Sequence, residues 1–294
     1  MNPSLQILTG QLKDLGGGFL VRRVLPAAQR RSVGPFVFFD HFGPSLETPD
    51  ARHDVRPHPH IGLATVTYLF EGAMLHRDSI GSVQLIEPGA INWMTAGRGI
   101  VHSERRPESL GEQSYVNHGL QLWVALPREF EEVEPAFTHT PALAIPELKL
   151  GSVTLRVLVG EAFGQRSPVR TLAPTLYLDV QLPAAGTLDL PVLAQEMAVY
   201  AVDGALLVNG QALAPQTMAV LGAQGGVTLS ATVATRLVVI GGAALDMPRV
   251  MWWNFVSSRK ERIVQAADNW QAQRMGQVPG ETEFIPLPDA RFKP

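Results

Sequence analysis

Glycine and proline punctuate this 294-residue chain throughout, with 27 glycines and 23 prolines spread along it. Between them lie short apolar or alternating runs. In the first half these runs cover residues 19–24, 36–39, 65–70, 83–86, 91–94 and 120–124. In the second half they cover residues 153–159, 176–182, 198–202, 206–208, 219–221 and 237–240. Many short strands joined by turns predict an all-β sandwich or barrel.

The length of the chain predicts two domains, because it exceeds what one hydrophobic core usually serves. A proline-rich stretch without periodicity lies between the two groups of strands, over residues 134–146. We therefore expect an N-terminal metal-binding barrel over 1–134, a linker over 135–146, and a C-terminal barrel over 147–294. The last part is expected to contain a helix at about 258–275 and an irregular tail.

The expected helix carries start and stop signals. Ser258 and Glu261 have the Ser-x-x-Glu spacing of a capping box, and Gly276 is placed to end the helix. Between them, residues at spacings of four, three and four form one stripe: Ile263, Ala267, Trp270 and Arg274. We expect Trp252 and Trp253 to pack this helix on the second barrel.

Composition narrows the classes of function. Hydrophobic residues make up 46% and charged residues 17%, as in globular proteins. A net charge of −3 gives no bulk attraction to nucleic acid or an anionic membrane. The chain has no cysteine, which excludes disulfides and thiolate metal sites. Its start lacks an apolar signal region and no run approaches a membrane span, so a cytoplasmic protein is expected.

Two short pairs with spacing i, i+2 indicate a metal site: His58 with His60, and His102 with Glu104. In an extended strand, residues two apart point to the same face. If the two strands are neighbours, three imidazoles and one carboxylate converge on one point. The alternative is that His58 and His60 lie in a polar loop and that Glu104 faces water beside Arg105.

This ligand set limits the metal. Imidazole suits iron, nickel, copper and zinc, while a carboxylate shifts the preference towards harder ions such as Fe(II) or Mn(II). Four ligands in an octahedral shell leave two positions for water, substrate or dioxygen, whereas a tetrahedral shell would be closed, as in structural zinc sites. One carboxylate only half neutralises a dication, which favours an anionic oxygen ligand such as an enolate or phenolate.

The two halves of the chain also resemble each other weakly. Residues 68–75 align with 200–207, and residues 96–104 align with 223–231. This register places an apolar residue opposite each candidate ligand: Leu190 for His58, Val192 for His60, Leu229 for His102 and Ala231 for Glu104. We therefore expect a metal in the first barrel and an apolar interior in the second.

Other polar residues are expected to have supporting or surface positions. Asp40 and His41 either support the ligand histidines or form a turn with His41 facing solvent. An acidic group is predicted to be a solvated connector: Glu129, Glu131, Glu132 and Glu134. The remaining histidines lack partner spacing and receive no role: His53, His76, His118 and His139.

A small β-barrel with His-x-His in one motif and a further histidine in a second resembles the cupin superfamily. Four longer strings are similar to its pirin branch: RSVGPFVFFDHFGP at 31–44, PHPHIG at 57–62, INWMTAGRGIVHSE at 91–104 and HGLQLWVALP at 118–127. Residues 159–164 and 167–169 also look pirin-like. The resemblance runs from about residue 17 to the C-terminal helix.

The resemblance implies that His58, His60, His102 and Glu104 hold one iron in the N-terminal barrel, and that the C-terminal barrel is metal-free. One divalent ion is therefore expected, Fe(II) first, with Mn, Ni, Co, Cu or Zn as alternatives. Ala64 stands where many pirins have a glutamate. In this family the glutamate of the second motif takes the ligand role.

The resemblance also implies two functions. Pirin-like proteins are associated with quercetin 2,3-dioxygenase activity, which opens a flavonol ring with dioxygen and releases carbon monoxide. This predicts a small aromatic enol or phenol and dioxygen as partners, with Glu104 accepting the 3-hydroxyl proton. Other pirins resemble redox-sensitive regulators, for which the partner is a protein that reads the charge of the iron. A structural zinc site without turnover is the third interpretation.

Overall fold

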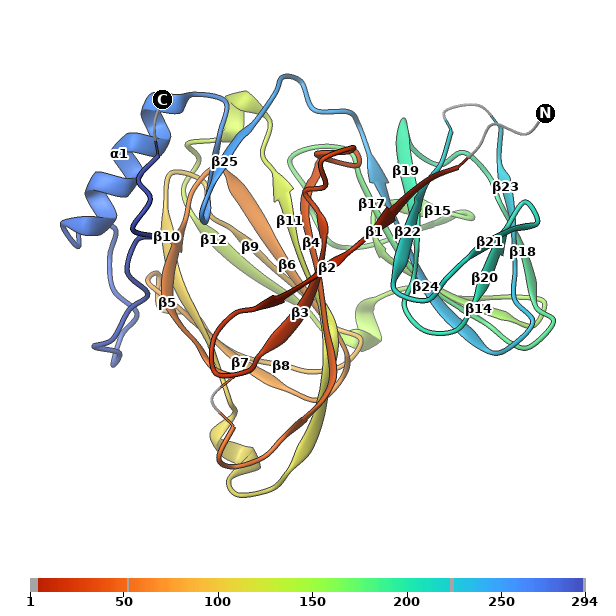
Figure 1. The fold of residues 1–294 in the computed structure, drawn as a ribbon, viewed down its shortest axis with the longest axis horizontal. Coiled ribbons are helices and arrows are strands. Elements are labelled where there is room, and N and C mark those ends of the chain that lie inside the picture. Colours follow the sequence, from red (N-terminus) through yellow and green to blue (C-terminus); the bar gives the residue numbers. More distant parts are fainter. Residues whose placement is uncertain (1–4, 52, 223–224, 293–294) are drawn as a thin grey trace. The chain divides into compact units, whose positions relative to one another are not determined.

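The computed structural model describes residues 5–51, 53–222 and 225–292 (Figure 1). Most of its regular structure is strand, divided between two compact units. The unit that we call the first barrel comprises residues 13–21, 42–139 and 245–294. The unit that we call the second barrel comprises residues 1–12, 22–41 and 140–244. Each unit is therefore built from three separate segments of the chain.

The first barrel contains a four-stranded sheet and most of a seven-stranded sheet, which also includes residues 11–12, 22–25 and 36–41 of the other unit. The larger sheet has the order β12 (Ala136–Thr140), β9 (Ile91–Thr95), β6 (Leu63–Glu71), β11 (Tyr115–Ala125), β4 (Phe36–Glu47), β3 (Leu20–Leu25) and β2 (Gln11–Asp14). The smaller sheet has the order β5 (Val55–His60), β10 (Ile100–Arg105), β7 (Met74–Asp78) and β8 (Val83–Ile86). Within the smaller sheet the paired strands run antiparallel.

The second barrel repeats this arrangement. Its larger sheet has the order β1 (Gln6–Thr9), β22 (Thr217–Val220), β19 (Glu196–Ala201), β24 (Thr235–Gly242), β17 (Thr175–Leu182), β14 (Val153–Val159) and β13 (Glu147–Leu150). Its smaller sheet has the order β18 (Thr187–Leu190), β23 (Val227–Ser230), β20 (Leu206–Val208) and β21 (Gln211–Leu213). The N-terminal strand β1 thus forms an edge of the second barrel.

The other elements are short. They are the ribbons β15 (Glu161–Ala162) with β16 (Gln165–Arg166) and β25 (Val250–Trp252) with β26 (Phe255–Ser257), the 3-10 turns η1 (Glu108–Leu110), η2 (Arg128–Phe130) and η3 (Ala142–Ala144), and the helix α1 (Lys260–Gln271). No helix in the described part of the chain has the length and apolar character needed to cross a membrane.

Side-chain alternation accounts for these sheets. Along β7 and β18, buried residues alternate with more exposed ones, which is the period of a strand with one face on a core. The second barrel encloses a continuous buried cluster of leucine, valine, alanine and methionine side chains. The expectation of an all-β protein with two barrels and a C-terminal helix is confirmed.

The C-terminal segment packs on the first barrel, which corrects its expected place in the second. Ile263, Ala266 and Trp270 of α1 share one buried cluster with Ile61 and Val101 of the first barrel. The two neighbouring tryptophans at 252 and 253 pack against the same cluster. In Figure 1 this blue segment runs alongside β5 and β10.

Both ends of α1 differ from the expectation. The helix begins after Arg259, without a side-chain cap, so the capping box does not form. The hydroxyl of Ser258 donates instead to Glu131, at 3.0 Å. The helix ends at Gln271, before Gly276, and Gln273 already has a left-handed φ of 52°.

The expected linker, residues 135–146, contains β12 and η3. The change from one compact unit to the other falls inside it, between His139 and Thr140. A division at this linker into two halves remains a prediction, because each unit also draws on segments far away in the sequence. Residues 223–224, which belong to the expected internal repeat, lie outside the described residues.

Candidate metal centre

The two candidate ligand strands are neighbours in the first barrel. β5 and β10 pair antiparallel, with His58 directly opposite His102 and His60 opposite Ile100. The register shifts between His102 and Glu104, where a β-bulge interrupts the pairing. Bulges are common beside functional sites, because they redirect side chains without ending the sheet. His58 and His60 thus lie on a strand, which excludes the polar-loop alternative.

The three histidines form one buried cluster. The ring centroids of His58 and His102 lie 4.3 Å apart, and each lies 5.0 Å from that of His60. One nitrogen from each ring can be chosen so that all three lie within 4.8 Å of one another. The exposed fraction is 7% for His58 and 1% for the other two. This spacing allows the three rings to hold one metal ion.

Backbone carbonyls fix two of these rings. His58 Nδ1 lies 2.9 Å from the carbonyl of Arg56, and His60 Nδ1 lies 3.0 Å from the carbonyl of Asn254. A carbonyl only accepts, so Nδ1 carries the proton in both rings and Nε2 keeps its lone pair. The outer hydrogen bond therefore prepares each ring to bind a metal through Nε2.

Burial keeps the imidazoles neutral. It lowers the pKa of His58 to about 4, and it lowers the pKa of His60 and His102 well below the usual range. Repulsion between the neighbouring rings lowers these pKa values further. Metal binding needs unprotonated imidazole, so the cluster is in the ligand form at neutral pH.

Glu104 lies beside the cluster on β10. Its Oε1 atom is 3.4 Å from Nδ1 of His102, and its exposed fraction is 8%. Burial raises the pKa of this carboxyl to about 8, despite the opposing effect of Arg105. Such a group keeps its proton at neutral pH unless a cation comes close.

Buried polar atoms that lack a hydrogen-bond partner show whether the site suits a metal. Among the described residues, both ring nitrogens of His102 and Oε2 of Glu104 are buried and lack a hydrogen bond. Leaving a buried polar atom unpaired costs about 1–3 kcal/mol. A divalent cation would satisfy one ring nitrogen of His102 and Oε2 of Glu104, together with the two prepared Nε2 atoms, so the donor set fits one.

Two further residues face the same interior. Across the pairing of β7 with β10, His76 is the partner of Glu104 and Asp78 is the partner of His102. His76 and Asp78 are buried, with His76 Nε2 3.1 Å from the carboxylate of Asp78. The ring of Phe137 stacks on His76 at 4.3 Å. The i, i+2 spacing of this His-x-Asp pair was a usable signal, although His76 was given no role.

The carboxylate of Asp40 and Nδ1 of His41 contact residues other than the candidate ligands. Both residues are buried on β4, which also excludes a turn with His41 in solvent. The carboxylate of Asp40 forms a two-point contact with the guanidinium of Arg23, at 2.8 and 2.9 Å. Nδ1 of His41 lies 2.8 Å from the hydroxyl of Tyr200.

The second barrel has an apolar interior at the equivalent strands, as expected. The pairing of β18 with β23 places Leu188 opposite Leu229, and Leu190 opposite Val227. The residue that matches His58 is therefore Leu188 rather than Leu190, because the cross-strand register differs from the sequence alignment by two residues. Leu188, Leu190 and Leu229 are all buried.

Two β-barrels in one chain, one carrying His-x-His opposite a third histidine on the neighbouring strand, define a two-domain cupin. Comparison with known families gives the branch. The Pirin family model matches residues 18–124, and the Pirin C-terminal cupin domain matches residues 177–276. A pirin-like protein of Caulobacter vibrioides is 46% identical over 288 residues, covering 96% of this chain and 99% of the relative. The chain belongs to the pirin family.

Solved structures agree with this assignment. Quercetin 2,3-dioxygenase from Acinetobacter baumannii is 33% identical, with a TM-score of 0.91 over 98% of this chain and 96% of that one. The bacterial pirin YhhW from Escherichia coli, solved in complex with nickel(II), has a TM-score of 0.66 over 82% of this chain and 100% of that one. At 15% identity, the second likeness is one of fold alone.

Proposed function

We propose that this pirin is a mononuclear metal-dependent dioxygenase of the quercetin 2,3-dioxygenase type. Its substrate would be a small aromatic enol or phenol with a flavonol-like ring, and its co-substrate dioxygen. The observation that carries the proposal is the pairing of a neutral three-histidine cluster with a buried carboxyl of raised pKa. The similarity to the Acinetobacter quercetin 2,3-dioxygenase supports the same reaction class.

In this proposal His58, His60, His102 and Glu104 hold the metal, and Fe(II) is the expected ion. One carboxylate neutralises only one of the two charges of a dication, and the three imidazoles are neutral, so the occupied site would keep a net positive charge. When bound, the ion would supply Lewis acidity towards an anionic substrate oxygen and one-electron chemistry towards dioxygen.

Glu104 is suited to accept the proton of the substrate hydroxyl. In the metal-free site, burial raises its pKa to about 8 and so makes it a stronger base than an exposed carboxylate. A bound cation would lower that pKa and keep the group ionised. Its unpartnered Oε2 atom leaves room for that proton. Glu104 would thus remove the 3-hydroxyl proton and prepare the ring oxygen as an anion, which requires the carboxylate to be a weak or displaceable ligand.

The exposed fractions of the four proposed ligands indicate a side from which a substrate would approach. His58 and Glu104 keep 7% and 8% of their surface exposed, whereas His60 and His102 keep 1% each. Substrate would therefore approach past His58 and Glu104. Behind them, the indole of Trp123 packs edge-on against His60 with centroids 5.0 Å apart, which excludes water from that side of the rings.

The test is metal loading under anaerobic conditions, followed by quercetin and oxygen. We expect consumption of dioxygen, one carbon monoxide released per ring opened, and loss of turnover in Glu104→Gln. Glu87→Gln changes an exposed carboxylate of the same barrel and is the matched control. If no ring-opened product forms with Fe, Mn, Ni, Co or Cu, the proposal is wrong for quercetin.

A further inference from the structure

The carbonyl that orients His60 comes from a distant part of the chain. Asn254 lies in the two-residue turn between β25 and β26, and its carbonyl is 3.0 Å from Nδ1 of His60. By contrast, the carbonyl that orients His58 belongs to Arg56, two residues away on the same strand. One ring of the cluster therefore depends on the correct docking of the β25–β26 ribbon.

This turn is strained and must be held by its surroundings. Trp253 has a left-handed φ of 52°, a conformation that costs non-glycine residues on the order of 1–3 kcal/mol. The ribbon also sits very close to the ligand strand. Val256 donates its N–H to the carbonyl of Ile61 at 3.2 Å, and a Cβ atom on Gly62 would lie 2.0 Å from the carbonyl oxygen of Val256.

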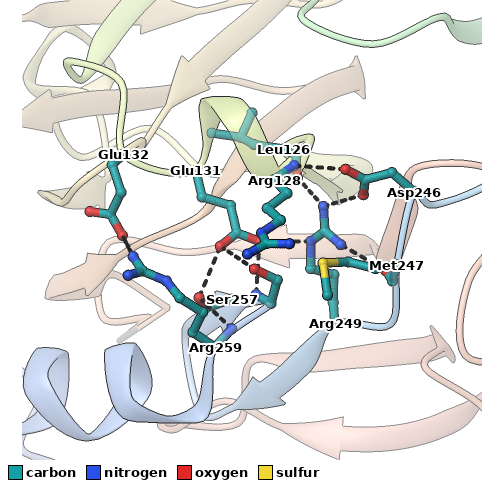
Figure 2. A network of polar contacts seen from close by, with 10 residues as sticks. Leu126, Arg128, Glu131, Glu132, Asp246, Met247, Arg249, Ser257 and Arg259 are labelled. Atoms are coloured by element: carbon teal, nitrogen blue, oxygen red, sulfur yellow. Dashed lines mark hydrogen bonds and ion pairs between the residues drawn. The ribbon is translucent and has the colours of Figure 1, made fainter.

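The ribbon is clamped by a buried carboxylate, Glu131, which follows η2 (Figure 2). Its exposed fraction is 3%, which corrects the expectation of a solvated connector for this residue. Glu131 accepts hydrogen bonds from the hydroxyl of Ser257 at 3.0 Å and from the backbone and hydroxyl of Ser258 at 2.8 and 3.0 Å. These donors immediately follow the residues that dock on Ile61.

Arg249 completes the clamp at the same end of the ribbon, because its neighbour Val250 pairs with Ser257. Its Nε atom lies 2.9 Å from Glu131, and the exposed fraction of its side chain is 2%. The same guanidinium donates to the carbonyl of Leu126 at 2.7 Å and to the carboxylate of Asp246 at 2.6 Å (Figure 2). Removing one partner of a buried ion pair leaves an uncompensated charge, so neither residue can change without disturbing the ribbon.

We propose that Glu131, together with Arg249, is a positioning residue of the metal centre. By clamping the β25–β26 ribbon, this pair places the Asn254 carbonyl on Nδ1 of His60 and directs Nε2 of that ring towards the metal. The ribbon is therefore part of the metal site, although it carries no ligand. The inference rests on the proposed metal centre but does not depend on flavonol turnover.

The experiment compares metal binding by the full-length protein and its variants, with Ni(II) and Co(II) as probes. We expect Glu131→Gln to weaken Ni(II) binding about tenfold to a hundredfold, as losses in the outer shell of metal sites do. The visible absorption bands of bound Co(II) should shift in the same variant. Glu132→Gln is the matched control, because Glu132 pairs with Arg259 and Arg262 at the exposed end of the loop and should leave binding unchanged.

Two further measurements make the test decisive. Asn254→Ala keeps the carbonyl and should bind Ni(II) like the unmodified protein. In the unmodified metal-free protein, nitrogen-15 NMR of the imidazoles should show His60 protonated at Nδ1. If that proton is found on Nε2, or if folded Glu131→Gln keeps the Ni(II) affinity and Co(II) spectrum of the unmodified protein, the proposal is overturned. The NMR result can overturn the proposal even if Glu131→Gln does not fold, and all these readouts are independent of quercetin.

Discussion

His58 and His102 are direct cross-strand partners on β5 and β10, with ring centroids 4.3 Å apart. Facing residues of an antiparallel pair share one side of the sheet, so the backbone register brings two of the proposed ligands together. The third, His60, lies two residues further along β5 on the same face. Strand pairing thus brings the three rings together, and the β25–β26 turn adds the carbonyl that orients His60.

Removing one imidazole should abolish tight metal binding. We expect His102→Ala to lose Ni(II) affinity by at least a hundredfold, because its ring lies within 5.0 Å of both other rings. His139→Ala is the control, since that histidine lies on β12 and bonds Asn92. Calorimetric titration of metal-free protein gives both values. Equal affinities in the two variants would contradict the site.

Metal affinity should rise with pH up to about 8. Burial raises the pKa of Glu104 to about 8, so below that pH a cation must displace its proton. Affinity should therefore increase by about tenfold per pH unit between pH 6 and 8, and then level off. The pKa of His58, at about 4, lies below this window. A Ni(II) titration series at several pH values measures the slope, and Glu104→Gln should flatten it.

The metal-free protein should become more stable when Glu104 cannot ionise. The folded-state pKa of about 8 lies above the ordinary value of 4.5, so the folded protein holds a proton that the unfolded chain releases. The stability linked to this carboxyl is complete below pH 4.5 and is lost as the pH rises towards 8. Glu104→Gln should thus be more stable by ~4 kcal/mol at pH 8 and equal to the unmodified protein at pH 4. Urea unfolding without metal tests this, and equal stabilities at pH 8 would contradict it.

The tail after α1 should stabilise the outer side of β10. The carboxylate of Glu281 accepts from the hydroxyl of Ser103 at 2.5 Å and forms an ion pair with Arg105. Glu281→Ala should lower the free energy of unfolding by about 1–3 kcal/mol, because it leaves buried donors unpaired. Glu283→Ala removes a second and half-exposed partner of Arg105 and should cost less than ~1 kcal/mol. Hydrogen exchange of the β10 amides should increase only in the first variant.

The helix should contribute to the core of the first barrel. Ile263 is fully buried against Ile61 and Val101, so Ile263→Ala should cost about 2–5 kcal/mol. Val264 lies on the partly exposed side of α1, and Val264→Ala should cost less than ~1 kcal/mol. Thermal unfolding of both variants measures the difference. Similar losses would mean that α1 contributes little through this face.

Strands with an apolar pattern could be read directly from the sequence. Residues 83–86, 153–159 and 206–208 form strands with the predicted bounds. Polar strands gave weaker signals. β5 contains two prolines and two histidines, and the apolar runs did not include it or β7. Both strands pair with β10, which lies more than twenty residues away in the sequence, and β7 has a second partner nearby, β8.

The grouping of His58, His60 and His102 could be predicted for a simple physical reason: residues spaced i, i+2 share one face in any extended strand. The groups that orient these histidines could not be predicted from the sequence. The sequence predicts a surface position for Glu131, because its partner Arg249 lies more than a hundred residues further along the chain. The bond from His60 to Asn254 uses a backbone carbonyl, which every residue has, so no pattern of residue types predicts it.

The segment order of the first barrel has a consequence for synthesis. Its helix, its ribbon and the carbonyl behind His60 all come from residues 245–294, after the whole of the second barrel has been made. A nascent chain that has reached residue 139 already carries all four proposed ligands. It still lacks the backbone that orients one of them, so the ability to capture metal should emerge only when translation of this chain nears its end.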